Sequence, residues 1–214
     1  MSTLSKCTWV IVGAVLLPAA ATAQTAAAIA GQGTAAMVST AGVNQQIANA
    51  ALPNDGGLAN ASIDAVNLAG TIVADGLATF TTGMMDLGTS SAQTTAEAAN
   101  VNLLNGLIVA RQVVAVASSY VSDAGTAASD GDGSTLLGLR IAGTDFGDVT
   151  PAPNTRVELP GVGYAILNEQ SQTGDGATTS GITVNMIHVV LLNSLTGLRA
   201  GEIIVGSAQS AVGS

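Results

Sequence analysis

The 214-residue chain has five Lys and Arg against fourteen Asp and Glu, a formal charge of −9, and only 9% of its residues are charged. This acidity excludes nucleic acid as an expected partner, because phosphates attract clustered Lys and Arg. With one histidine and 2% aromatic residues, the chain also lacks most of the side chains by which catalytic sites are recognised. We therefore expect that the protein is not an enzyme.

The first 23 residues have the pattern of a secretory signal peptide. Lys6 precedes an apolar run at Cys7–Ala19, and Ala21-Thr22-Ala23 offers small residues for cleavage before Gln24. A transmembrane anchor fits less well, because a spanning helix needs about 20 apolar residues and this run is shorter and interrupted by glycine and proline. We expect an exported protein, secreted or at the cell surface, with no membrane attachment after cleavage.

Cleavage would leave a mature chain without cysteine, lysine or tryptophan. Its four Arg would face fourteen acidic residues, a formal charge of −10. Since no disulfide can form, stability has to come from burial, and a chain of this length can support one substantial core.

Short apolar runs alternate with clusters of turn-forming residues along the mature chain. The runs include Thr135–Ile141, Gly163–Leu167, Ile182–Leu192 and Ile203–Val205, and the clusters lie at Pro53–Gly57, Asp130–Gly133, Pro151–Asn154 and Thr173–Gly176. This pattern is typical of strands in an all-β sandwich or barrel. We predict one domain over residues 24–214, an antiparallel β-sandwich or barrel-like domain of roughly ten strands.

Two related runs stand in the first half of the chain. We interpret Val101–Tyr120 as a central strand, and Val66–Thr82, 35 residues upstream, shares its V-N-L start and I-V-A centre. A solenoid normally needs at least three units, so we favour duplication of a hairpin within one sandwich. For Gln24–Ala51, where glycines interrupt any helical pattern, we favour one or two strands.

Strict alternation along Ile182–Leu192 predicts two largely apolar faces. One face would hold Thr183, Asn185, Ile187 and Val189, and the other Val184, Met186, His188 and Val190. We expect a central strand, covered on both faces or facing a partner on one of them.

The acidic loop at Asp130-Gly131-Asp132-Gly133 is the strongest candidate site. Carboxylate oxygens and flexible glycines suit calcium, so Asp130 and Asp132 are the candidate metal ligands. The loop is incomplete as an EF-hand, since Ile141 stands where a bidentate Glu is required, and other acidic residues would have to complete it: Asp123, Asp145, Asp148 and Asp175. A solvated turn is the simpler interpretation.

Catalytic candidates are weak. His188 is the sole histidine and has no G-x-S-x-G context, so a packed or edge-strand histidine is the simpler interpretation. Glu158 and Glu169 are the one carboxylate pair that suggests a glycosidase, and they flank a predicted turn. We therefore predict no catalytic residues and no bound cofactor, calcium apart.

Several short stretches, in a fixed order, carry a resemblance to a known family. They are Val101–Ile108, Leu159–Gly163, Leu167–Gln170, Ile187–Val189 and Gly197–Ala208. Together they resemble the bacterial choice-of-anchor proteins, most closely the P type. The resemblance implies a secreted, non-enzymatic, β-rich domain displayed at bacterial surfaces, with members that differ in their C-terminal anchoring signal.

The C-terminal segment departs from that family pattern. The sequence reaches Ser214 without an apolar span or basic cluster, and Val162 stands where a sortase signal requires Thr. We expect no covalent C-terminal anchor.

Two functions are consistent with these features. The first is an exported structural or adhesive protein whose partner is itself or another surface protein. The absence of lysine in the mature chain favours it, because soluble proteins often protect edge strands with Lys. The alternative is a monomeric calcium-dependent or ligand-binding extracellular module, favoured by the Asp-Gly loops.

Overall fold

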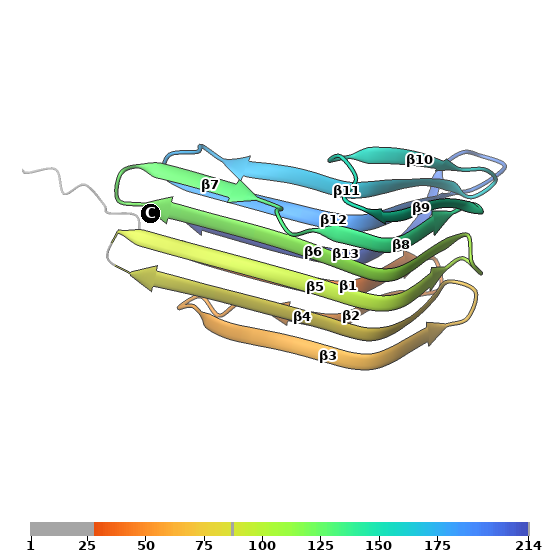
Figure 1. Cartoon of the computed structure of the whole chain (residues 1–214), viewed down its shortest axis with the longest axis horizontal. Helices are drawn as coiled ribbons and strands as arrows, with labels where there is room; N and C mark the ends of the chain where they lie inside the picture. Colours follow the sequence, from red (N-terminus) through yellow and green to blue (C-terminus); the bar gives the residue numbers. More distant parts are fainter. Residues whose placement is uncertain (1–27, 87, 214) are drawn as a thin grey trace, which may run out of the picture.

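The computed structural model describes residues 28–86 and 88–213, so the predicted signal peptide and its cleavage site before Gln24 lie outside the described part of the chain. The described residues form thirteen β-strands, and among them no helix is long and apolar enough to cross a membrane. The strands pair antiparallel in two sheets that face each other (Figure 1). The predicted all-β fold is confirmed in its sandwich form, with thirteen strands where the sequence predicted roughly ten.

Each sheet takes strands from both halves of the chain. Sheet A contains β1 (Ala28–Thr40), β2 (Asn44–Ala51), β10 (Thr155–Leu159), β11 (Gly163–Gly174), β12 (Thr179–Leu192) and β13 (Arg199–Gly213). Sheet B contains β3 (Gly57–Leu68), β4 (Ile72–Asp86), β5 (Thr89–Leu103), β6 (Ile108–Ser122), β7 (Thr126–Asp130), β8 (Thr135–Ile141) and β9 (Thr144–Val149). The strand orders are β10-β11-β12-β13-β1-β2 and β3-β4-β5-β6-β8-β9, with β7 also paired to β6. The consecutive strands β2 and β3 therefore end the two sheets on the same side of the sandwich (Figure 1).

A row of residues crosses each sheet where its strands bend (Figure 1), and we call it the kink row. It comprises Ala48, Ala35, Gly206, Met186 and Asn168 in sheet A, and Asp64, Gly76, Asn100, Arg111 and Gly138 in sheet B. Six of these residues have a positive φ, from 49° at Asn100 and Asn168 to 67° at Gly206. A bulge-like irregularity of this kind bends a strand and re-aims the side chains beyond it.

The kink row corrects the predicted faces of β12. Met186 and Ile187 are adjacent in the chain and both fully buried, so the alternation shifts by one residue between them. Ile187 and Val189 point into the core, whereas His188 lies on the outer face. Strict alternation, which grouped His188 with Met186, was wrong for this strand.

The kink row also separates two kinds of core. On the side where the chain ends (C in Figure 1), small residues predominate between the sheets: Gly31, Gly33, Thr79, Thr81, Ala92, Thr94, Ala96, Ala115, Ala117, Ser119 and Ser210. A smaller aliphatic cluster of Ile29, Leu52, Val121 and Val212 is also buried on this side. On the other side the interior is built from large aliphatics: Ile72, Leu103, Ile108, Leu139, Ile141, Leu159, Ile187 and Ile203. The scarcity of aromatic residues thus matches a core built from small residues and aliphatic side chains.

In the small-residue half the two sheets approach closely. A methyl group on Gly31 would lie 2.2 Å from Thr81 Oγ1, and one on Gly33 would lie 2.3 Å from Thr79 Cγ2. Thr79 Oγ1 donates to the carbonyl oxygen of Ala48 at 2.7 Å, which joins sheet B to the kink row of sheet A. Glycine on one sheet therefore makes room for threonine on the other.

Buried serines link the sheets farther along this half. Ser119 Oγ lies 2.7 Å from Ser210 Oγ and 2.8 Å from Ser129 Oγ, and Ser129 Oγ lies 2.7 Å from Ser180 Oγ. The four hydroxyls belong to β6, β13, β7 and β12, so the chain of hydrogen bonds passes between sheets B and A. Pairing in this way offsets the cost of burying hydroxyl groups.

The interpretation of Val101–Tyr120 as one central strand was wrong. The segment holds the end of β5, a turn around Gly106 and most of β6. Its upstream counterpart, Val66–Thr82, holds the end of β3, a turn at Gly70 and most of β4. The shared V-N-L motif therefore ends the first strand of a hairpin in both stretches, and their duplication stays a prediction. The predicted strands within Gln24–Ala51 are confirmed as β1 and β2 over residues 28–51.

Candidate functional site

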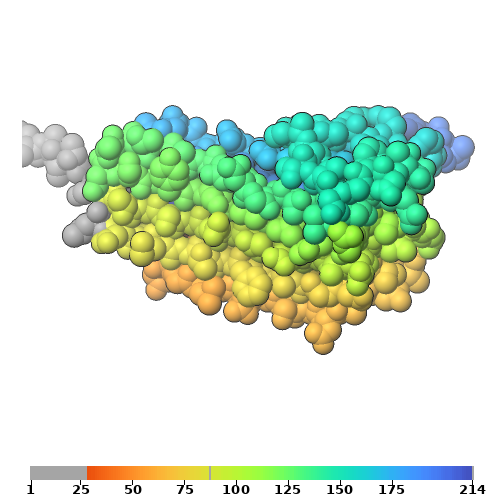
Figure 2. Space-filling model, in the orientation of Figure 1, coloured from red at the N-terminus to blue at the C-terminus, as the bar shows by residue number. Residues whose placement is uncertain are grey.

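Asp130 is the last residue of β7, and Asp132 lies in the turn between β7 and β8. Asp130 Oδ1 accepts a hydrogen bond from the backbone N–H of Asp132 at 3.1 Å, the geometry of an aspartate that stabilises its own turn. The turn borders an open hollow of about 570 Å³, visible between β7 and the β8–β10 region (Figure 2). Asn168, Gln170 and Gln172 also line the hollow, and Asn168 Oδ1 accepts a hydrogen bond from Gln170 Nε2 at 3.0 Å. Carboxylate and amide side chains therefore border the same hollow.

The other acidic residues considered for this site have separate roles. Asp148 forms an exposed ion pair with Arg111, with 3.0 Å between Asp148 Oδ1 and Arg111 Nη2. Asp145 Oδ1 accepts from the N–H of Gly147 at 2.8 Å. Asp175 accepts hydrogen bonds from the N–H groups of residues 177–179, and these bonds hold the pKa of its carboxyl far below the usual range. Within residues 28–86 and 88–213, no three His, Cys, Asp or Glu side chains are grouped as a metal site would require, and calcium at Asp130 and Asp132 stays a prediction.

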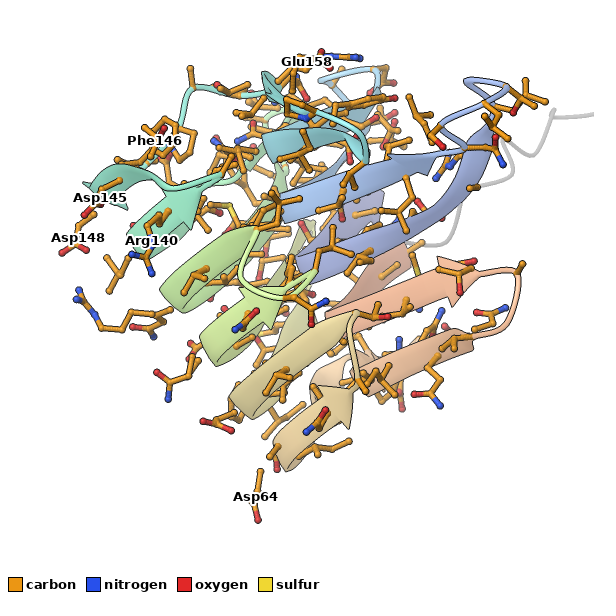
Figure 3. All side chains as sticks on the ribbon, turned by 90° about the vertical axis from the view of Figure 1, so that its right-hand side faces the viewer. Asp64, Arg140, Asp145, Phe146, Asp148 and Glu158 are labelled. Carbon is orange, nitrogen blue, oxygen red and sulfur yellow. The ribbon has the colours of Figure 1, made fainter. Side chains whose placement is uncertain are left out.

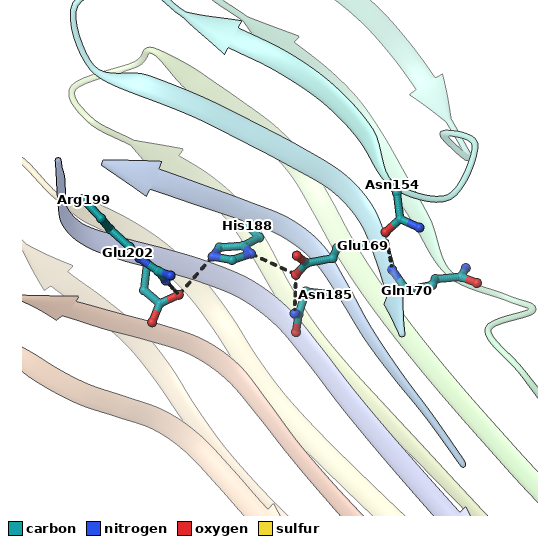
Figure 4. A network of polar contacts seen from close by, with 7 residues as sticks. All are labelled: Asn154, Glu169, Gln170, Asn185, His188, Arg199 and Glu202. Carbon is teal, nitrogen blue, oxygen red and sulfur yellow. Dashed lines mark hydrogen bonds and ion pairs between the residues drawn. The ribbon is translucent and has the colours of Figure 1, made fainter. Parts of the chain in front are cut away.

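The most developed polar cluster is centred on His188, on the outer face of sheet A. His188 Nδ1 lies 2.8 Å from Glu169 Oε2 on β11, and Nε2 lies 2.9 Å from Glu202 Oε2 on β13 (Figure 4). Arg199 pairs with the same oxygen of Glu202, and Asn185 Nδ2 donates to Glu169 Oε2 at 2.7 Å. We call these five residues the histidine cluster.

The two carboxylates of the histidine cluster favour a protonated ring, although burial of the ring opposes it. The His188 side chain is 12% exposed, and only an imidazolium can donate from both nitrogens to two carboxylates. The hydrogen bond and charge of Glu169, together with the charge of Glu202, raise the pKa of His188 against the opposing effect of burial. The hydrogen bond from His188 in turn lowers the pKa of Glu169.

The histidine cluster joins neighbouring strands through noncovalent contacts. Both ring nitrogens face carboxylates, so the imidazolium presents no lone pair with which to act as a base or bind a metal. Its contacts tie β11, β12 and β13 together on the outer face of sheet A. His188 is thus neither a simple packed histidine nor an edge-strand histidine.

Glu158 and Glu169 do not form a glycosidase pair. Glu158 lies opposite Tyr164 and pairs with Arg156, with 2.6 Å between Oε1 and Nε, and the Arg156 guanidinium stacks on the Tyr164 ring at 3.6 Å. Glu169 lies five residues beyond Tyr164 along β11, roughly 16 Å at about 3.3 Å per residue. The two backbone positions are thus farther apart than the roughly 5 to 9.5 Å between the carboxyl groups of glycosidases. Each carboxylate is also paired elsewhere, Glu158 with Arg156 and Glu169 with His188 and Asn185.

Comparison of the chain with protein-family models, with curated proteins and with solved structures returned no match.

Proposed function

We propose that this chain is an exported structural or adhesive protein that acts at the cell surface or outside the cell through its β-sheet edges. The observation that carries this proposal is β3, a twelve-residue edge strand paired only with β4 in the described part of the chain. It contains no Lys, Arg or Pro, its one charged residue is Asp64, and Leu58 in it is 62% exposed, so little of its length is protected. The backbone groups of such an edge can accept a strand from another chain.

A second observation supports the proposal. The stretches that resemble the choice-of-anchor proteins include Glu169, His188, Arg199 and Glu202, four of the five residues of the histidine cluster. They also include Asn168 and Gly206 of the kink row. The resemblance thus falls on residues that shape sheet A, as expected for a family whose shared property is a displayed scaffold.

The proposal is tested in the cells that produce the protein. We expect the chain in the extracellular or surface fraction, lacking residues 1–23, and we expect cells without the gene to lose cell–cell or cell–surface attachment. Adding the purified chain from Gln24 onward should restore attachment, whereas heat-denatured chain should not. Retention of the protein in the cytoplasm, or attachment that is independent of the gene, would contradict the proposal.

The hollow beside Asp130 supports a second candidate function, a calcium-dependent or ligand-binding module. Calcium at ten times its dissociation constant should stabilise the folded chain by about 1.4 kcal/mol, which raises Tm by about 3 to 5 °C in a domain of this size. Thermal unfolding with calcium and with chelator measures this shift. Asp130→Asn with Asp132→Asn should abolish it, whereas Asp123→Asn, in the turn between β6 and β7, should leave it unchanged. Equal Tm values with calcium and chelator would remove this candidate.

A further inference from the structure

The side of the sandwich formed by β2 and β3 carries almost no charge. The eight residues of β2 include no charged side chain, and the twelve residues of β3 include one, Asp64. Figure 3 shows Asp64 projecting away from the sandwich at this edge, and its side chain makes no hydrogen bond or ion pair within the described chain.

Asp64 also marks the point where the kink row of sheet B reaches its edge. It lies opposite Gly76 on β4, which has a φ of 52°, and the row continues through Asn100, Arg111 and Gly138. Between β4 and β5 the register shifts at this level, so Gly76 and Asn100 lie on either side of the Asp75–Ala99 pair. The irregular positions of neighbouring strands in sheet B therefore lie close to one level, although they are not all directly opposite. A strand added to β3 has to bend at the same level, since otherwise a bent segment would meet a straight one and the backbones would diverge.

A second copy of the chain meets this requirement in one arrangement. A two-fold axis perpendicular to sheet B at the kink places the second β3 antiparallel to the first, with the two kinks aligned. The same axis brings the β2 edges of the two copies to face each other, because β2 and β3 lie on the same side of the sandwich. It also places the two Asp64 side chains next to each other.

The dimensions of this side suit a specific interface. Twelve residues of strand extend about 40 Å at about 3.3 Å per residue, and two sheets packed about 10 Å apart give a side roughly 20 Å wide. The area is then about 800 Å² per copy, the standard size for a stable protein–protein interface.

We propose that the β2–β3 side is a self-association surface of this protein and that the charge of Asp64 opposes pairing of the two copies. The inference rests on the proposed function, because an edge that adds strands is useful to a protein that builds or joins surfaces. The repulsion acts at the symmetry axis, where the aligned kinks bring two carboxylates together. Any change that neutralises Asp64, or places a cation opposite it, removes this repulsion and allows the two β3 edges to pair.

Sedimentation equilibrium of the chain from Gln24 onward, at physiological salt, tests this inference. Asp64→Asn should strengthen dimerisation about tenfold or more relative to wild type, because two like charges within about 6 Å repel even near the surface. Asp55→Asn is the matched control, since it removes the same charge from the loop just before β3, and it should behave as wild type. Circular dichroism establishes that each variant is folded.

A charge-reversal experiment identifies the contact. Asp64→Lys alone should stay monomeric, because two cations then meet at the axis, but an equimolar mixture of Asp64→Lys with wild type should form heterodimers. Asp64→Asn that associates no more than Asp55→Asn, or a mixture that forms no heterodimer, would overturn the inference. If attachment of cells depends on the protein while both association results fail, the proposed function stands and a different surface is responsible.

Discussion

Replacement of Gly33 by alanine is expected to lower the free energy of unfolding by about 3 kcal/mol, although it adds a single methyl group. That methyl would lie 2.3 Å from Thr79 Cγ2 and 2.8 Å from Thr94 Cγ2, both on the facing sheet. Neither sheet can retreat without separating the small-residue half of the core. For a domain of this size the loss corresponds to a fall in Tm of roughly 10 °C, measured by calorimetry or thermal circular dichroism.

Two further variants separate this explanation from a general effect of alanine. Gly42→Ala makes the same chemical change where no atom lies within 4 Å, and it should leave Tm unchanged or slightly raised. Thr79→Ser removes the obstructing methyl but keeps the hydroxyl that donates to Ala48, so it should recover part of the stability lost in Gly33→Ala. If Gly42→Ala is as damaging as Gly33→Ala, close approach of the sheets is not the cause.

The sequence allowed prediction of the features that depend on local chemistry. The clusters at Pro53–Gly57, Asp130–Gly133, Pro151–Asn154 and Thr173–Gly176 all lie at connections between strands. Turn preferences of Asp, Asn, Gly and Pro act over a few residues, so they can be interpreted without knowledge of the fold. The all-β class followed from the apolar runs between these turns.

The kink row could not be predicted in the same way. A positive φ at Gly76 is unremarkable in a glycine, but Ala48 and Asn168 adopt it because the neighbouring strands bend at the same level. Which residues are neighbours depends on strand order, and that order is a property of the whole fold. The predicted face of His188 failed for this reason, since the alternation shifts at Met186 and Ile187.

The histidine cluster was missed for a related reason. Glu169 and Glu202 lie 19 and 14 residues from His188 in the chain, and no local motif joins them. They meet His188 because β11, β12 and β13 are neighbours in sheet A and the kink turns His188 to their shared outer face. A single histidine between two apolar residues gives no sequence indication of two carboxylate partners.

Replacement of His188 by glutamine should lower the free energy of unfolding by about 2 to 4 kcal/mol at pH 5.5. Removal of one partner from a fully buried ion pair costs about 3 to 5 kcal/mol, and the cost here should be somewhat smaller because the cluster is only partly buried. Glutamine has similar size but no charge, so Glu169 and Glu202, 27% and 23% exposed, would face each other without the imidazolium between them. Arg111→Gln is the control, because it breaks an ion pair whose side chains are 63% and 59% exposed. It should cost at most about 1 kcal/mol.

The cost of His188→Gln should depend on pH in a direction set by the cluster. The raised pKa of His188 means that its contribution is complete below the unfolded value of 6.5 and is lost as the pH rises through the folded pKa. The lowered pKa of Glu169 means that its contribution is complete above 4.5 and is lost as the pH falls through the folded pKa. The groups facing the ring are Glu169 and Asn185 on one side and Glu202 with Arg199 on the other, so no other charge reverses these signs.

Denaturant unfolding at intervals from pH 4 to 9 measures this dependence. The gap in unfolding free energy between wild type and variant should be largest at pH 4.5 to 6.5 and should narrow above that range. A gap that stays constant up to pH 9 would mean that His188 is neutral in the folded protein and that the cluster is held by hydrogen bonds alone.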